Sequence, residues 1–239
     1  MMRTFSSMFK NKEIRNKILF TLAMLLIYRV GSAIPVPGVD ATKLASQISD
    51  NSVLSMMNLL GGGALERLSV FAMGVTPYIT ASIIIQLLSM DVIPALTEMT
   101  KSGQTGRMKM EKITRYLGVV LSFVQAYSLV YGFDKQYSVL ANSNLSGYLY
   151  TATVLTAGTM FLIWLGDRIS MKGIGNGLSI IIFAGIVSNM PSQFVQVWNV
   201  LAGGTTQGEL FNGILQFALF VLLYIIIIVF VVVMETAVR

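Results

Sequence analysis

Six stretches of this chain are almost entirely apolar, and each has roughly the length of a helix that crosses a membrane. The hydrocarbon core of a bilayer requires about 20 apolar residues, with a range of about 17–25. Hydrophobic residues make up 54% of the 239-residue chain and charged residues only 12%, whereas soluble domains are about 25% charged. We therefore predict an all-α integral membrane protein with six transmembrane helices, at residues 18–34, 75–90, 116–133, 148–165, 173–190 and 214–234.

The stretch from Gly61 to Leu88 breaks this pattern, because two apolar pieces meet at Gly74. The first piece, Ala64 to Met73, is too short to cross a bilayer. Gly74 can adopt backbone angles that other residues avoid, and Pro77 favours the first turn of a new helix. We predict a short, loosely packed half-helix that runs into a longer helix. Broken helices at membrane depth line a cavity or pack on protein, so a pore element and a kinked packing helix both remain open.

Two residue types are missing, because the sequence has no cysteine and no histidine. Their absence excludes disulfides, thiol nucleophiles, metal sites built on Cys or His, and Ser-His-Asp triads. The predicted spans also carry no Asp or Glu in their middle, where ion-coupled transporters and pumps usually need one. We predict a protein that is not an enzyme and that uses no metal and no cofactor.

Basic residues are distributed unevenly along the chain. Of the 17 Lys and Arg residues, 13 lie in the first 17 residues, in the loops at 91–115 and 167–172, and at the end of the chain. Cytoplasmic loops carry this excess in membrane proteins, so both termini are predicted to be cytoplasmic. The net charge of +6 then reflects topology rather than nucleic-acid binding. The predicted parts are a basic cytoplasmic tail at 1–17, a five-span unit at 18–190 that includes the broken stretch 61–74, and an outer loop with the sixth span at 191–239. Pro191 is predicted to end the fifth span.

Three patterns inside the spans each have two interpretations. The glycine-rich run from Lys172 to Ser179 at the start of the fifth span fits close helix packing or the lining of an aqueous vestibule. Gln86 and Gln125 fit hydrogen bonds that hold helices together or a seam that opens. Aliphatic residues four apart share one helix face, which is common in any span and carries no function by itself. Two such pairs are Val75 with Ile79 and Leu178 with Ile182.

Several longer runs, taken in order, resemble the N-terminal half of the SecY family of protein-conducting channels. They are RVGSAIPVPG at 29–38, GGAL at 62–65, PYITASIIIQL at 77–87, GTMFLIWLG at 158–166 and GIGNGLSIIIFAGIV at 173–187. The runs cover the first, second, fourth and fifth predicted spans. The resemblance implies one half of a ten-span channel that is built from two five-span halves of inverted topology.

The resemblance also implies roles for particular residues. The half-helix after Gly63 would be a plug that seals the outer vestibule, and the second and third spans would form one wall of a lateral gate to lipid. Four of the six apolar residues of the family's pore ring fall on Val75, Ile79, Leu178 and Ile182. The plug falls on Gly62, Gly63, Ala64, Leu65, Glu66, Arg67, Leu68 and Ser69, and the polar cluster of the gate on Thr80, Gln86 and Gln125. The family usually has isoleucine where Val75 and Leu178 stand, a change that keeps the ring apolar.

The implied activity is the passage of unfolded secretory polypeptides across the bacterial plasma membrane and the lateral release of membrane-protein helices. The implied partners are SecE, SecG, the SecA motor, the ribosome, signal sequences, nascent polypeptides and the lipid bilayer. The family's last four spans are expected to be missing, so this half alone is not expected to translocate anything. Two other classes stay open: a solute transporter or channel, which the lack of midplane acids disfavours, and a scaffold or insertase that binds a partner helix without forming a pore.

Overall fold

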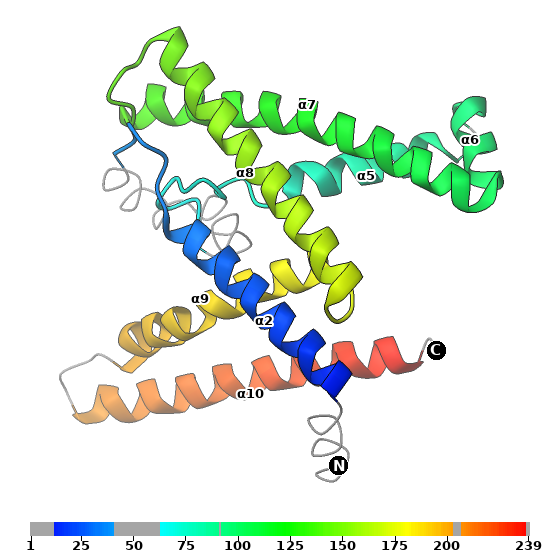
Figure 1. Cartoon of the computed structure of the whole chain (residues 1–239). Coiled ribbons are helices and arrows are strands. Elements are labelled where there is room, and N and C mark those ends of the chain that lie inside the picture. Colours follow the sequence, from blue (N-terminus) through cyan, green and yellow to red (C-terminus); the bar gives the residue numbers. More distant parts are fainter. Residues whose placement is uncertain (1–11, 41–62, 91, 203–206, 238–239) are drawn as a thin grey trace. The chain divides into compact units, whose positions relative to one another are not determined.

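The computed structural model describes residues 12–40, 63–90, 92–202 and 207–237, and most of them are helical (Figure 1). The helices are α2 (Lys12–Ala33), α5 (Thr76–Leu88), α6 (Pro94–Lys101), α7 (Gly103–Tyr137), α8 (Leu145–Lys172), α9 (Gly177–Ala202) and α10 (Gln207–Ala237). Among the described residues, α2, α7, α8, α9 and α10 contain segments long and apolar enough to cross a membrane. The 13 residues of α5 extend about 20 Å at 1.5 Å per residue, less than the roughly 30 Å of a bilayer core. The protein is thus an all-helical, multi-pass membrane protein with five full-length candidate spans in its described part.

Two boundaries differ from the sequence-based expectation. The expected loop at 91–115 is largely helical, because α6 and the first turns of α7 occupy it. Its lysines, arginines and methionines are good helix formers, and at 35 residues α7 is about 50 Å long and extends beyond a bilayer core. Pro191 does not end the fifth span, since it lies inside α9. Helices in membranes tolerate an internal proline where neighbouring groups satisfy the freed backbone carbonyl.

The chain divides into two compact units, Met1–Val187 and Ser188–Arg239. The amide that Pro191 lacks would have bonded the carbonyl of Val187, the last residue of the first unit. In the second unit, aromatic rings of α9 and α10 contact one another, with Trp198 edge-on to Phe217 at 5.0 Å between ring centroids. The most apolar stretch of α10 has no buried residue among those described, as expected of a helix whose surroundings are lipid or a partner protein.

In the first unit, α5 lies alongside α7 (Figure 1). Pro77, Ala81 and Ile85, spaced by four residues, form the buried face of α5. The facing stripe on α7 consists largely of small residues, and Gly118 there lies against Tyr78 and Ala81. Small side chains let two backbones approach closely, which is how helices associate in a membrane. The contact fixes the direction in which the opposite face of α5 points.

Candidate functional site

Residues 63–75 form a series of turns, not the half-helix that the sequence led us to expect. We call residues 63–75 the turn segment. Leu68 has a left-handed φ of 41°, which interrupts any right-handed helix. The segment also pairs with the chain beyond α2: the amide of Val36 donates to the carbonyl of Leu68, and the amide of Val70 donates to that of Ile34, both at 3.1 Å. These long-range hydrogen bonds use backbone groups that a helix would need. Gly61 and Gly62, the first residues of the predicted plug stretch, lie outside the described residues.

The turn segment is also packed more tightly than predicted. Ala64, Leu65 and Leu68 are at most 1% exposed. The two leucines belong to a cluster that includes residues of α7 and α8. Glu66 is half-buried and Arg67 is exposed, so only the charged tip of the segment faces outward. The expectation of a loosely packed element was wrong for this state, because the aliphatic residues around the charged pair all point into the core.

Phe71 joins the turn segment to two helices, a contact that the sequence reasoning missed. Its ring stacks on Tyr28 of α2 at 6.3 Å and on Phe161 of α8 at 5.8 Å between centroids. Two glycines make room for the segment: a Cβ on Gly31 would overlap the Phe71 ring, and one on Gly158 would overlap the Val70 carbonyl. Both glycines stand in the runs quoted above, but their neighbour is distant in sequence and could not be identified from it.

The junction at Gly74 forms as predicted. Gly74 has a positive φ of 57°, and α5 begins two residues later with Pro77 in its first turn. Val75, at the N-cap of α5, is 5% exposed. It belongs to an apolar cluster that includes Tyr28, Phe71 and Ile181, with Leu178 and Ile182 packed against it. The bend therefore places Val75 in the cluster against which Leu178 and Ile182 of α9 pack.

The fourth residue of the predicted ring lies elsewhere. Ile79 is 38% exposed and stands outside that cluster. It lies on the face of α5 turned away from α7, in an exposed row with Ile83 and Leu87. Leu178 has a contact of its own on α8, where its side chain fills the space in front of Gly166. Thus three of the four predicted ring residues belong to one apolar cluster or pack against it, and Ile79 borders an open apolar face.

The predicted gate residues do not form one hydrogen-bonded cluster within the described part of the chain. The Thr80 hydroxyl donates to the carbonyl of Thr76 in its own helix at 3.1 Å. Gln86 is exposed on α5 and Gln125 is half-buried on α7. Thr80 and Gln86 are six residues apart, so they point about 120° apart around the helix. These side chains thus lie on α5 and α7 without joining the two helices through direct bonds.

The glycine-rich start of α9 packs closely on other elements. Gly177 faces the backbone of Gly166 so tightly that a Cβ would overlap its carbonyl. The amide of Ile174 donates to the Thr21 hydroxyl of α2 at 3.2 Å. Asn176 caps the helix, since its Oδ1 accepts the amide of Leu178 at 3.1 Å. Gly177 thus shows the close packing that one interpretation predicted, while Ile174, Gly175 and Asn176 are exposed and the vestibule interpretation stays a prediction.

Comparisons with known proteins give matches in both sequence and structure. The SecY family model matches residues 69–239. The chain is 48% identical to the protein translocase subunit SecY of Bacillus subtilis (strain 168), over all of this chain and 56% of that protein. It is 48% identical to the same subunit of Staphylococcus aureus (strain NCTC 8325 / PS 47), over 82% of this chain and 46% of that protein. The chain therefore spans about half the length of these curated relatives.

Solved structures share the fold at low sequence identity. One is described as Sec61 in the canine ribosome-channel complex from the endoplasmic reticulum, and another as the structure of a protein conducting channel. Each matches with a TM-score of 0.55 and 20% identity, over 79% of this chain and 38% of the other.

Proposed function

This chain belongs to the SecY family, and we propose that it forms the N-terminal half of the pore of a protein translocase. The pore would pass unfolded secretory polypeptides across the membrane and release membrane-protein helices sideways into lipid. It performs no covalent chemistry, and the work of moving the polypeptide comes from a partner.

The observation that carries this proposal is the apolar cluster where α5 meets the turn segment. Val75, Leu178 and Ile182 contribute only aliphatic groups there. An apolar constriction dewets and so resists ions, without offering a binding site to them. Aliphatic side chains also make no specific contact with a polypeptide, so the same constriction suits chains of any sequence. Residues 62–69 would add a second seal, the plug, most of which lies in the turn segment.

The open face of α5 supports a lateral gate. Ile79, Ile83 and Leu87 form an exposed row on the side turned away from α7. A signal sequence is an apolar helix, and such a row gives it a surface that it can contact while it partitions into lipid. Thr80, Gln86 and Gln125 would be the polar residues of this gate, and Ile79 would complete this half's share of the ring.

The proposed architecture has six spans and a plug. The second span lies at 75–90 and contains α5, and the plug precedes it. We propose a tail at 1–17, a five-span unit from 18 to about 190, and a last part with the sixth span up to 239, although the limit at 190/191 falls inside α9. The proposed partners are SecE, SecG, SecA, signal sequences, nascent polypeptides and the ribosome, with which one structural neighbour, the canine Sec61 channel, forms a complex. We propose no nucleic-acid binding by this half.

The proposed location is the bacterial plasma membrane, with both termini in the cytoplasm. Because the chain has no native cysteine, single-cysteine labelling tests the orientation without background. Cysteine at the exposed Ser102, between α6 and α7, is expected to react with an impermeant maleimide only from the cytoplasmic side. Cysteine at the exposed Asn144, before α8, is expected to react only from outside. The reverse pattern at both positions would overturn the orientation.

Photo-crosslinking to an arrested polypeptide tests the function itself. A benzophenone amino acid at Ile79 is expected to crosslink to a secretory polypeptide stalled in membranes of the cells that make this chain, because the side chain borders the proposed pore. The same probe at Val231, an apolar and more exposed position on α10, is expected to react with lipid or partner subunits instead. Polypeptide adducts at Val231 and none at Ile79 would contradict the proposed path.

A further inference from the structure

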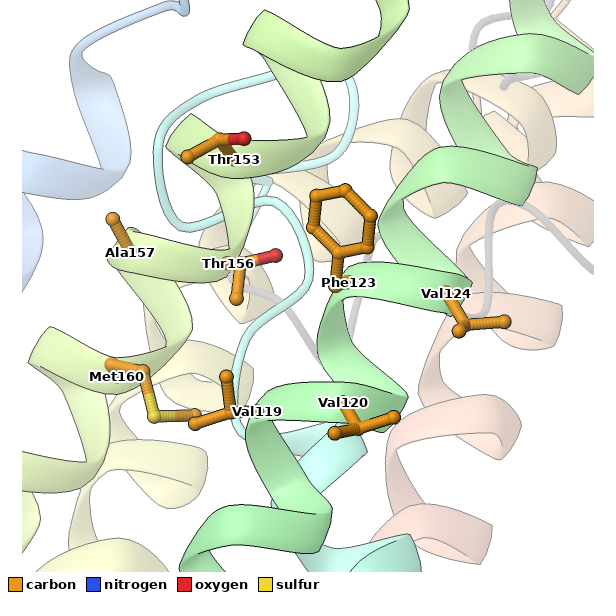
Figure 2. A pocket seen from close by; sticks show the side chains of 8 residues that line it. All are labelled: Val119, Val120, Phe123, Val124, Thr153, Thr156, Ala157 and Met160. Atoms are coloured by element: carbon orange, nitrogen blue, oxygen red, sulfur yellow. The ribbon is translucent and has the colours of Figure 1, made fainter.

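An apolar groove runs between α7 and α8, and none of the predicted ring, plug or gate residues lines it. Four residues of α7, from Val119 to Val124, and four of α8, from Thr153 to Met160, line a volume of about 520 Å³ (Figure 2). Phe123 forms part of its wall and packs on the buried cluster below. A volume of this size falls in the range of ligand sites, about 300–1,000 Å³.

Polar contacts join the two helices at both ends of the groove. At one end the buried Asp134 carboxylate accepts the Tyr148 hydroxyl at 2.6 Å and the Leu140 amide at 3.0 Å. At the other end Arg115 pairs with Asp167 at 2.7 Å. Between these two fixed points the facing side chains are mostly small, which leaves the space open.

The residues that line the groove favour an aliphatic ligand. Its only polar side chains are Thr153 and Thr156. Both hydroxyls already donate to carbonyls of their own helix, at 2.7 and 2.8 Å. Neither threonine therefore needs a polar partner, and both present methyl groups. A flexible hydrocarbon chain fills such a groove without leaving any polar group unsatisfied.

The mouth of the groove is aromatic and basic. Residues three, four, seven or eight apart share a helix face, so Tyr116 and Lys112 continue the groove face of α7, and both are exposed. On α8, Trp164 follows Met160 by one turn, and the Arg168 guanidinium lies 5.4 Å above the Trp164 ring. Tyr and Trp with Lys and Arg beyond them are typical of the zone where lipid head groups begin. Positive charge at this level complements an anionic head group.

We propose that the α7–α8 groove binds one acyl chain of an anionic phospholipid, whose phosphate lies against Lys112 and Arg168. The groove holds the hydrocarbon and the basic mouth selects the head group. The bound lipid would fill the space between the two fixed ends of the helix pair as a structural component.

Trp164 reports on the occupant directly. The chain has two tryptophans, and Trp198→Phe leaves Trp164 as the only one. The purified chain is placed in phosphatidylcholine nanodiscs that contain a minor fraction of brominated lipid, whose bromines quench tryptophan on contact. Brominated phosphatidylglycerol is expected to bind about fivefold more tightly than brominated phosphatidylcholine, since one cationic residue near the head group contributes about 1 kcal/mol. Lys112→Gln is expected to remove most of that preference.

A matched pair of variants separates the groove from the general lipid surface. Val120→Phe fills the groove, whereas Val231→Phe makes the same change on α10; the two valines are 59% and 56% exposed. Only Val120→Phe is expected to reduce quenching at low brominated-lipid content. Equal quenching by both lipids, or equal behaviour of the two phenylalanine variants, would overturn the proposal. A third outcome is that neither lipid quenches Trp164 and that its emission depends on the protein density in the membrane. This outcome would assign the groove to a second copy of the chain and would also overturn the proposal.

Discussion

Gly158→Val is expected to push the turn segment off α8 and to expose residues that are now fully buried. A Cβ at Gly158 would overlap the backbone carbonyl of Val70, and a backbone atom cannot rotate away as a flexible side chain does. The valine adds two further methyl groups at the same place. Overpacking of this kind costs about 1–3 kcal/mol and occasionally more. Because the clash falls on the turn segment, we expect much of the strain to be relieved by its displacement.

Thiol accessibility measures that displacement. In a Ser69→Cys variant the new thiol replaces a hydroxyl that is 0% exposed, so its reaction with a maleimide is expected to be slow. Adding Gly158→Val is expected to raise that rate by at least about tenfold, which corresponds to a loss of about 1.4 kcal/mol of protection. Gly132→Val on α7 is the control, because a Cβ there meets nothing within 4 Å. Equal rates in the two valine variants would mean that Gly158 does not hold the segment in place.

The sequence predicts the elements of this fold well where the signals are local. Apolar length predicts the positions of the long helices, and Gly74 with Pro77 predicts the bend and the start of α5. The conformation of the turn segment was not predictable in this way. It depends on hydrogen bonds to Ile34 and Val36 and on the ring stack with Tyr28 and Phe161, all of which join residues far apart in the chain.

The candidate site shows the same division between local and distant information. Helical spacing places Val75 beside Ile79 on one face, but the N-cap position of Val75 turns it into the core while Ile79 stays on the open side of α5. The four-residue spacing assumes that both residues lie inside one helix. It therefore does not predict their directions when the helix begins right after Val75. The prediction that Pro191 ends the fifth span followed the general rule for proline and was wrong, because α9 continues on both sides of it.

The second large effect concerns the apolar constriction. Ile182→Gly removes an aliphatic side chain that packs against the Val75 cluster, so water is expected to enter the closed pore. Each 1.4 kcal/mol or so removed from the barrier to an ion raises its passage about tenfold. We therefore expect the closed-channel conductance to rise by at least about tenfold. Phe183→Gly is the matched control, because it makes the same change at the next residue of α9, where the side chain is 66% exposed. Both variants place glycine inside the helix and carry a similar backbone cost of about 1 kcal/mol.

The most direct measurement is the ion conductance of the resting translocase in planar bilayers, purified from cells whose own gene for this chain carries each change. We expect a leak with Ile182→Gly and a tight seal with Phe183→Gly, at equal amounts of folded protein. A tight seal with Ile182→Gly, or an equal leak from both variants, would contradict the claim that Val75, Leu178 and Ile182 close the pore.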